Sequence, residues 1–458
     1  PLVPAMSAEA SDMSSYLLMG IPGLAYLSGV ADASWTAIGL AIGTYLNFLL
    51  VARRLRRYSV ELDAITIPSF ISKRYGEKKP IIMGIASLII LVFFVPYVAS
   101  GLAAIGKLFN SLFGWNYMLS VIVGAIVIIS YTSVGGFSAV ATMDLIQSVI
   151  MTVALCVIVV FGIVQAGGMD AVLAHASSLP GFLSFGQTYN AASGQAEPYG
   201  LIRIVSMLAW GLGYFGMPHI IIRFMSVKSD KELKKAAKVG IGWTFFILMF
   251  AVLVSVVAHL FLGDGQESST IFIAIVRRIF TGPWLGLISG LLLSAILAGA
   301  MSTADSQLLA ASSAFASDVY KPVIRKGQST DKEMLWVGRI VVLVIAAAAL
   351  LIASNPGSGT IMSLVENAWG IFGASFGPVI VLSLFWRGFT FSGAAAGIVA
   401  GAVVDVLWLV LFKSTGVYEI VPGFAAGLLA AVIASKCSSA ESRETAAALF
   451  DQCIAYKD

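Results

Sequence analysis

Long apolar runs, separated by shorter polar stretches, recur along the whole chain. Each run is about 20 residues or more, which is the length that a helix needs to cross the hydrocarbon core of a bilayer. Outer-membrane barrel strands would instead alternate apolar and polar residues over about ten positions. The pattern therefore predicts an all-α membrane protein with about twelve spanning helices. We place them at residues 4–28, 34–52, 80–110, 115–133, 138–166, 199–224, 239–263, 282–317, 336–353, 361–386, 391–412 and 419–435.

The composition agrees with this reading and argues against a soluble enzyme. Of 458 residues, 59% are hydrophobic and 11% are charged, whereas a soluble chain carries about 25% charged residues. The spans and their connections use the whole length, which leaves no room for a separate catalytic domain. Neither a nucleophile–base pair nor a set of metal ligands is evident, and Cys156, Cys437 and Cys453 lack the spacing of a redox or metal motif. We therefore expect no enzymatic activity and no transition metal.

The basic residues predict an orientation. With twelve alternating spans, 23 of the 28 Lys and Arg residues fall on one side, among them Arg56, Arg74 and Arg223. The other five are Lys107, Arg203, Arg277, Arg278 and Lys413. Cytoplasmic connections are enriched in Lys and Arg, so we expect both ends of the chain in the cytoplasm and the protein in the plasma (inner) membrane. This distribution, rather than a nucleic-acid partner, accounts for the net charge of +4.

Two of the twelve segments contain helix-breaking residues near their middle. The first has polar residues at 11–15 followed by Gly20, Pro22 and Gly23, and the sixth has glycines and a proline between Trp210 and His219. Proline removes a backbone donor and glycine permits unusual backbone angles. Small residues also serve close helix packing, but breaks five spans apart are typical of inverted-repeat transporters that bind their solute at the breaks.

This symmetry gives a division of the chain. We expect a first repeat at 1–166, an extracellular loop at 167–198, a second repeat at 199–386, two additional helices at 387–435 and a cytoplasmic tail at 436–458.

Five acidic residues stand within the predicted spans: Glu9, Asp12, Asp144, Asp305 and Asp405. A charge at the centre of a spanning helix costs about 2.5–3.5 kcal/mol on insertion scales. No basic residue lies near these acids at comparable depth in the sequence, so cations, water or protonation must compensate them. Coupling to a monovalent cation is the most economical of the three explanations.

The eighth segment makes the ion site more specific. At 100° per residue, Ser302, Asp305 and Ser306 share one helical face and Thr303 is adjacent. Hard cations prefer such oxygen ligands, and the carbonyls of a broken helix would complete the shell. Hydrogen bonding between helices is the alternative for this cluster. Asp405 lies outside the ten repeat helices, and we exclude it from the site.

Aromatic residues near the breaks are candidates for the solute pocket. Trp210 and Tyr214 are four residues apart and share a helical face, Tyr97 follows Pro96, and Tyr16 lies at the first break. An aromatic wall with a few polar groups suits a small, partly apolar solute. Packing or interfacial roles are the alternative, and we expect His219 to be a packing residue rather than a metal ligand.

Several motifs together resemble the sodium/solute symporter family, specifically its sodium/proline symporter branch, nearly from end to end. They are Ala10-Ser-Asp-Met-Ser14, Leu17-Leu-Met-Gly-Ile-Pro-Gly23, Trp210-Gly-Leu-Gly-Tyr-Phe-Gly216 with Pro218-His219, Leu293-Ser-Ala-Ile-Leu297, Met301-Ser-Thr303, Phe376-Gly-Pro378 and Tyr418-Glu-Ile-Val-Pro-Gly423. The resemblance implies an inverted-repeat (5+5) fold of the leucine-transporter type plus two C-terminal helices. Family members usually have one more helix before the first broken one, so we expect the natural chain to begin before Pro1.

The resemblance also implies a set of site residues. Sodium (Na+), the coupling ion, would be bound by backbone oxygens of Ala10, Met13 and Gly299 and by the side chains of Ser302 and Thr303. Asp12 resembles an acid important for sodium coupling, and Asp144 an acid that some relatives use for ion release or for a second sodium. Asp305 and Ser306 are further second-ion candidates. The implied solute contacts are Ser14, Tyr16, Tyr97, Trp210, Tyr214, Met217 and Pro218.

Three positions depart from the family pattern: Tyr16 replaces a frequent tryptophan, Met217 stands where relatives have glutamine, and Asp305 replaces a small polar residue. The expected function is sodium-driven import of L-proline by alternating access across the lipid bilayer. Another small amino acid, a carboxylate solute or proton coupling are the alternatives on the same fold, and a passive channel or a sensor is a more remote one. We expect no obligate protein partner.

Overall fold

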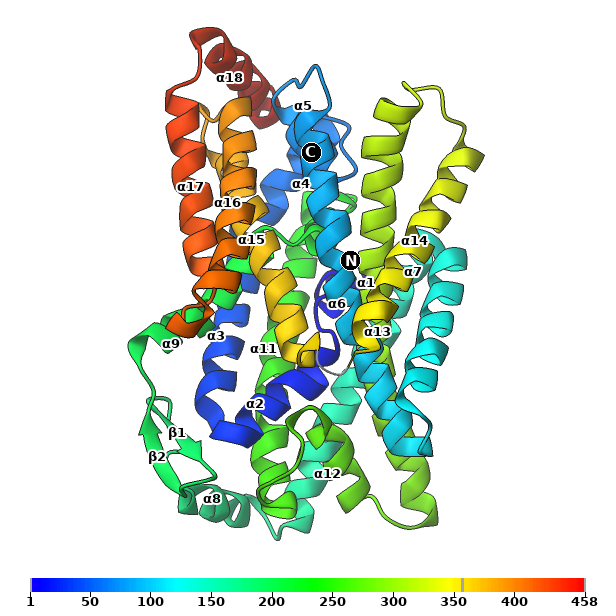
Figure 1. Ribbon diagram of the computed structural model, residues 1–458, viewed down its shortest axis with the longest axis vertical. Coiled ribbons are helices and arrows are strands. Elements are labelled where there is room, and N and C mark those ends of the chain that lie inside the picture. The colour runs from blue at the N-terminus through cyan, green and yellow to red at the C-terminus, as the bar shows by residue number, and fades with distance from the viewer. Residues whose placement is uncertain (1, 356–357, 457–458) are drawn as a thin grey trace.

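The computed structural model describes residues 2–355 and 358–456 as a bundle of helices that run mostly along the long axis of the molecule (Figure 1). The predictions made for Pro1, Lys457 and Asp458 lie outside the described residues. Several helices begin at a Ser or Thr whose hydroxyl accepts a hydrogen bond from the first turn, as Ser229, Thr330, Thr360 and Thr390 do.

The first half of the chain forms the helices that enclose the first break. In chain order they are α1 (Leu2–Ala10), η1 (Tyr16–Gly20), α2 (Ile21–Ser28), α3 (Val30–Leu46), η2 (Asn47–Ala52), α4 (Arg53–Glu61), α5 (Ile67–Arg74), α6 (Ile81–Phe113) and α7 (Tyr117–Gln165). The α7 segment bends at Gly136, whose φ of 62° is readily adopted only by glycine. It therefore covers two of the predicted spans.

The second half begins with a connection that carries a short helix and a hairpin. Its elements are α8 (Met169–Ser178), β1 (Gln187–Asn190), β2 (Gln195–Pro198), α9 (Leu201–Leu208), η3 (Ala209–Phe215), α10 (Pro218–Met225), α11 (Asp230–Leu262), η4 (Ser268–Thr270), α12 (Ile271–Ile279), α13 (Pro283–Ser313), η5 (Ala314–Ile324), α14 (Asp331–Ala353) and α15 (Ile361–Phe385). Strands β1 and β2 are antiparallel, with Gln187 opposite Pro198. This hairpin is a small addition to the all-α architecture.

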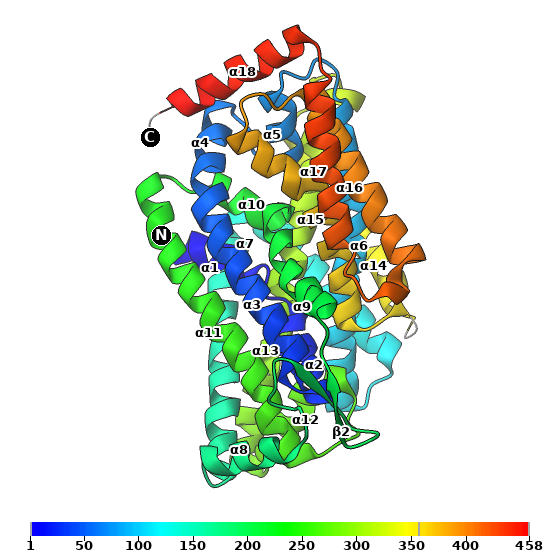
Figure 2. The same ribbon diagram turned by 90° about the vertical axis from the view of Figure 1, so that its left-hand side faces the viewer.

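Four elements follow the second half: α16 (Phe391–Leu411), η7 (Lys413–Thr415), α17 (Ile420–Lys436) and α18 (Ala440–Ala455). Helices α16 and α17 pack against each other and against α15. Figure 2 shows α18 lying across the end of the molecule next to α4 and α5. The predicted cytoplasmic tail therefore contains a docked helix, in which Phe450 contacts Tyr58 with ring centroids 6.1 Å apart.

The count of spanning helices is lower than predicted when length and composition are the criteria. Eight helices of the described residues qualify, or ten if each of two bent pairs is one span. The shorter apolar helices Tyr16–Ser28 and Tyr117–Ser130 fall below that length. They belong to the first broken segment and to the part of α7 before its bend, so the predicted number of twelve counts segments that are interrupted or shortened.

Both predicted breaks are present. Residues 11–14 separate α1 from the helical turn that leads into η1, and the helices on either side of Met217 are bent by 42°. Tight packing holds the second break in place: a Cβ on Gly216 would lie 2.0 Å from the carbonyl oxygen of Phe372 in α15. Any larger residue there would push the break away from α15.

Candidate functional site

The first break places backbone oxygen atoms against α13. The Ser302 hydroxyl donates to the carbonyl of Ala10 at 3.0 Å and also lies 3.2 Å from the carbonyl of Gly299. A Cβ on Gly299 would lie 3.3 Å from the carbonyl oxygen of Ser14. The absence of a side chain at Gly299 therefore allows the non-helical segment after α1 to approach α13. Met13 is part of the same non-helical stretch. Three of the five residues expected to bind sodium, Ala10, Gly299 and Ser302, thus meet in one small region, and Met13 follows Ala10 in the adjoining non-helical stretch.

The fifth residue, Thr303, follows Ser302 and is 2% exposed. Its hydroxyl oxygen has no hydrogen-bond partner among the residues that the structure describes. Buried hydroxyl groups are nearly always paired, because an unpaired one costs about 1–3 kcal/mol. Carbonyl and hydroxyl oxygens of this kind are the ligands that hard cations prefer. The arrangement can therefore bind a small monovalent cation.

Asp144 has a basic partner that the sequence analysis did not anticipate. Arg223, at the end of α10, is 2% exposed, and one of its amino groups lies 2.9 Å from the Asp144 carboxylate. The same guanidinium donates to Ser7 at 2.7 Å and to Ser306 at 2.5 Å. The expectation that the intramembrane acids lack basic partners is therefore wrong for Asp144, because the break in the sixth segment turns Arg223 inward.

Two other arginines assigned to polar connections are also buried. Arg56 is 3% exposed and Arg74 is fully buried. Arg56 donates to the carbonyl of Val227 at 2.8 Å, and Arg74 to the carbonyl of Ala446 in α18 at 2.9 Å. These side chains attach the connections and α18 to the bundle instead of facing water.

Asp305 and Ser306 lie beside the sodium-site candidates, as their helical spacing predicts. The Ser306 hydroxyl donates to the carbonyl of Ser302 at 2.7 Å and lies 3.2 Å from the Asp305 carboxylate. Asp305 is fully buried. The guanidinium of Arg223 thus stands among the second-ion candidates and supplies a positive charge there.

Asp12 connects the two breaks. Its carboxylate accepts a hydrogen bond from the hydroxyl of Tyr214, which lies on η3. The His219 ring makes a second connection, with its Nε2 atom 3.2 Å from the carbonyl of Ser11. His219 therefore has a hydrogen-bonding role in addition to the packing role that we expected. These contacts hold the unwound parts of both broken helices together.

Aromatic rings surround the breaks and are almost completely buried. Tyr16 and Trp210 have ring centroids 6.3 Å apart, and the indole N–H of Trp369 on α15 donates to the carbonyl of Trp210 at 2.7 Å. The Tyr214 ring meets Trp369 edge-on at 5.1 Å. Each of these four side chains is at most 1% exposed. We call this group, Tyr16, Trp210, Tyr214 and Trp369, the aromatic cluster.

Tyr97, Ser14 and Met217 are also buried around the breaks. The Tyr97 ring meets the His219 ring edge-on, with centroids 6.1 Å apart, and the Ser14 hydroxyl accepts from the backbone N–H of Tyr16 at 3.3 Å. Met217 is the fully buried residue just before α10. Tyr97 and Trp210 each retain a polar atom without a hydrogen-bond partner in the described part of the chain, the Tyr97 hydroxyl and the Trp210 indole nitrogen.

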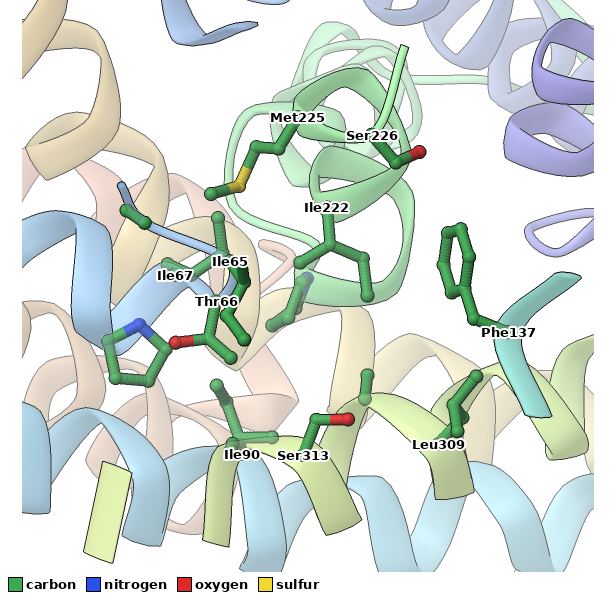
Figure 3. A pocket seen from close by; sticks show the side chains of 15 residues that line it. Ile65, Thr66, Ile67, Ile90, Phe137, Ile222, Met225, Ser226, Leu309 and Ser313 are labelled. Atoms are coloured by element: carbon green, nitrogen blue, oxygen red, sulfur yellow. The ribbon is translucent and has the colours of Figure 1, made fainter. Parts of the chain in front are cut away.

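A mostly apolar cavity of about 280 Å³ reaches the second break from the side of α4 and α5. Pro218, at the start of α10, is part of its wall. Figure 3 shows Ile222, Met225 and Ser226 on one side and Ile65, Thr66 and Ile67 facing them. Thr66 donates to Asp318 at 2.7 Å beside this cavity. Of the expected solute contacts, Pro218 is therefore on this cavity, whereas the aromatic cluster is packed further inside.

Sequence reasoning missed Trp369, Tyr418 and Arg223. Trp369 lies in α15, a helix without a break, and Tyr418 lies in the loop before α17, so no local pattern distinguishes them from packing residues. Their rings contact Trp210 at centroid distances of 6.2 and 5.5 Å. A signal for Arg223 was available, since it lies five residues after Pro218 and two after Ile221, within the apolar part of the segment.

Comparison with known proteins identifies the group to which this arrangement belongs. The profile of the sodium:solute symporter family matches residues 1–401. The chain belongs to this family. It is accordingly a multi-pass membrane transporter and not an enzyme.

Similar proteins in this family are described as proline transporters. The osmoregulated proline transporter OpuE of Bacillus subtilis is 42% identical over 95% of this chain and 87% of its own length. The high-affinity proline transporter PutP of the same organism is 40% identical over 100% and 94%. Sodium/proline symporter 2 of Staphylococcus saprophyticus is 41% identical over 95% and 85%.

Solved structures of other transporters share the fold. A Na+-coupled sialic acid symporter in a substrate-bound outward-open state has a TM-score of 0.75 at 18% identity, over 96% of this chain and 90% of its own. The nucleobase-cation-symport-1 transporter Mhp1 has a TM-score of 0.58 at 14% identity, over 98% and 96%. The chain thus has the predicted inverted-repeat fold of the leucine-transporter type, with additional C-terminal helices.

Proposed function

We propose that this protein imports L-proline together with sodium by alternating access between the two sides of the plasma membrane. The observation that carries the proposal is the meeting of a buried oxygen cluster with a buried aromatic cluster at the two helix breaks. Relatives named as proline transporters at 40–42% identity support the choice of solute. Alternating access needs a binding site between two halves that can move, and broken helices at the site provide it.

In the proposed ion site, sodium is bound by the carbonyls of Ala10, Met13 and Gly299 and by the hydroxyls of Ser302 and Thr303. On binding, the Ser302 hydroxyl would turn a lone pair toward the ion and release the Ala10 and Gly299 carbonyls to do the same. The site would then join α1 to α13. Asp12, through its bond to Tyr214, would transmit this ordering to the aromatic cluster.

We propose one sodium ion per cycle, because Arg223 already supplies the positive charge beside Asp144 and Ser306. A charge that moves through 100 mV releases about 2.3 kcal/mol, and a tenfold sodium gradient adds about 1.4 kcal/mol. Together they support about 500-fold accumulation of a zwitterion that carries no net charge. A single ion is therefore sufficient for concentrative uptake.

In the proposed solute pocket, the pyrrolidine ring of proline lies against Tyr16, Trp210 and Tyr214. The carboxylate would accept from the Trp210 indole N–H and the Tyr97 hydroxyl, whose polar atoms lack partners in the described residues. Ser14, Met217 and Pro218 complete the wall. The cavity beside Pro218 would be the route by which the solute leaves toward the cytoplasm.

The proposed orientation follows from the basic residues. The α4–α5 region and α18 lie at one end of the molecule, and α8, α12 and the hairpin lie at the other (Figure 1). We assign the first end, with most of the Lys and Arg residues, to the cytoplasm. With this assignment, the loop at 167–198 in the proposed five-part division is extracellular and the tail at 436–458 is cytoplasmic.

Uptake of radiolabelled proline into proteoliposomes tests the function. We expect concentrative uptake with an inward sodium gradient and only slow equilibration when potassium replaces sodium. Excess unlabelled proline should abolish uptake of the label. Uptake that is unchanged without sodium would refute the coupling, and a carrier of another amino acid or of a carboxylate would show no proline uptake and would be identified by a panel of labelled solutes.

A further inference from the structure

Three acidic side chains meet where α15, α16 and α17 pack together, outside the proposed sodium and solute sites. Glu366 is on α15, Asp405 on α16 and Glu419 directly before α17. A Cβ on Gly370 would lie 3.1 Å from a carboxylate oxygen of Asp405 and 3.2 Å from the Cγ of Glu419. The side chains of Asp405 and Glu419 therefore flank the same glycine.

Asp405 and Glu419 are nearly inaccessible to water, at 1% and 6% exposure. Each has one carboxyl oxygen without a hydrogen-bond partner among the described residues. Within the described residues, neither Asp405 nor Glu419 forms an ion pair with a basic side chain. Two buried carboxylates without cations repel each other and lose their hydration, so both cannot remain ionised at low cost.

The groups that face these carboxyls can be named for each neighbouring element. Glu366 on α15 and Asp405 on α16 both interact with the charge of Glu419. Lys413 on η7 acts on both Glu366 and Glu419, and Arg203 on α9 and Asp32 on α3 act on Glu366. Arg203 is engaged in an ion pair with Asp32 at 2.8 Å. Tyr418 lies between this acidic group and the transport site. Lys413 is exposed and forms no ion pair with these acids among the described residues, so it offsets their mutual repulsion only in part.

A proton fits this position better than a metal ion. Groups of three or more His, Cys, Asp or Glu side chains with metal-binding geometry are absent from the described residues. A proton needs only one carboxyl oxygen and a neighbouring acceptor, which two adjacent carboxyls provide. The loop that leads from α16 to Glu419 carries the exposed residues Lys413 and Gly416.

The acidic group is one aromatic ring away from the proposed solute pocket. The Tyr418 hydroxyl donates to the backbone carbonyl of Glu366 at 2.8 Å, and its ring lies 5.5 Å from that of Trp210. A Cβ on Gly423 of α17 would lie 3.0 Å from the Cβ of Asp405, so α16 and α17 are closely packed at this point. Repulsion between Asp405 and Glu419 would therefore move Tyr418 relative to Trp210.

We propose that Asp405 and Glu419, with Glu366 beside them, form a proton-binding site whose occupancy controls the affinity of the solute pocket. With a proton bound, the two carboxyls share a hydrogen bond, α16 and α17 remain packed, and Tyr418 supports Trp210. Loss of the proton leaves two like charges beside the same glycine and weakens this support. The site gives the two C-terminal helices a part in transport, and its effect on proline binding rests on the proposed function.

Proline binding to the purified full-length protein tests the proposal at saturating sodium and varied pH. For the wild type, we expect the Kd for proline to rise about fivefold between about pH 6 and about pH 9, because deprotonation destabilises the pocket. Asp405→Asn and Glu419→Gln should each keep the low-pH Kd across this range. Glu441→Gln, at an exposed position on α18, is the matched control and should behave as the wild type.

Two results would overturn the proton site: a pH-independent Kd in the wild type, or wild-type pH dependence in both neutral variants. Restoration of the high-pH affinity by sodium raised well above the concentration that saturates proline binding at low pH would overturn it as well, in favour of a metal-ion site. Tryptophan fluorescence separates this proposal from the proposed function, because the pH step of the wild type should be absent in Asp405→Asn without any solute. If proline fails to bind at every pH, the proposed function is wrong while the fluorescence step still tests the proton site.

Discussion

At the scale of single residues, Thr303 combines three properties that are expected of the ion ligand that we propose. Its hydroxyl is buried, has no hydrogen-bond partner in the described residues, and follows a serine that already contacts the Ala10 carbonyl. A hydrogen bond between helices could explain the burial of the Ser302 hydroxyl. It could not explain the burial of the Thr303 hydroxyl, whose oxygen forms no hydrogen bond within the described residues. This residue is therefore the sharper test of the sodium site.

We predict that Thr303→Ala raises the sodium concentration for half-maximal proline uptake about tenfold, since one of five oxygen ligands is lost. The maximal rate at saturating sodium should change much less. Sodium titration of uptake in proteoliposomes measures both quantities. Ser294→Ala on the same helix is a suitable control, because the Ser294 hydroxyl donates to the carbonyl of Leu291 within its own helix. Unaltered sodium dependence in Thr303→Ala would contradict the assignment.

The residue types in the sequence indicated the chemistry of the site, but they did not indicate which side chains pair with each other. The spacing of Ser302, Asp305 and Ser306 was sufficient to place them on one face, because helix geometry is local. The Asp144–Arg223 pair was not predictable from spacing, since the two residues are 79 positions apart. Only the packing of α7 and α10 against α1, whose Ser7 bonds to both side chains, brings them into contact.

At the scale of elements, Arg223 joins the inner half of the second broken helix to the helices around it. Its guanidinium bonds to Ser7 on α1, Asp144 on α7 and Ser306 on α13. It also donates to the carbonyl of His219, one turn earlier in α10. A buried ion pair of this kind fixes a geometry more than it adds net stability.

We predict that Arg223→Gln and Asp144→Asn each destabilise the protein by about 3–5 kcal/mol, because each leaves its partner charged and buried. The double variant should be more stable than the Arg223→Gln single variant, since no uncompensated charge remains. Thermal unfolding of the purified proteins in detergent measures the three changes. Strictly additive losses would show that the two groups do not interact, and Arg53→Gln, in an exposed pair with Asp230, is the control that should cost much less.

The hydropathy of a segment does not always predict its structure in this protein. The polar sequence after Lys436 gave no sign of a packed helix, yet α18 covers α4 and α5 through Phe450 and the buried Cys453. A helix that lies along the end of the bundle needs only a few apolar contacts, so its composition looks like that of a tail. Conversely, the interruption predicted between 133 and 138 takes the form of a bend at Gly136 within the continuous helical segment α7.

At the scale of the whole molecule, the distribution of Lys and Arg predicts which end faces the cytoplasm. Cys437, between α17 and α18, is exposed, whereas Cys453 is buried in α18. Both lie at the end that we assign to the cytoplasm, and Cys156 is a half-buried residue within α7. The cysteines therefore allow the orientation to be measured without engineered sites.

We predict that a membrane-impermeant maleimide leaves Cys437 unmodified in intact cells and modifies it once the membrane is permeabilised. Mass spectrometry of the purified protein can identify the modified position. Cys437→Ser is the control and should remove the signal, because Cys453 is shielded by packing. Modification of Cys437 in intact cells would reverse the proposed orientation.

The sequence by itself determined what depends on local chemistry. Apolar runs longer than a bilayer requires, helix-breaking residues at two matching positions and oxygen-bearing side chains at helical spacing were enough to predict the membrane class, the inverted-repeat fold and the cluster around Ser302. Each of these follows from rules that act within a turn or a span.

The tertiary structure decided which distant groups meet. It turned Arg223 toward Asp144, placed Trp369 and Tyr418 against Trp210, and brought Asp405 and Glu419 to one glycine. These contacts depend on how helices far apart in sequence pack, and no local pattern encodes that packing. In a low-dielectric interior the identity of the neighbour decides whether an acid is paired, protonated or bound to an ion, and for that reason the roles of the buried acids could be assigned only in three dimensions.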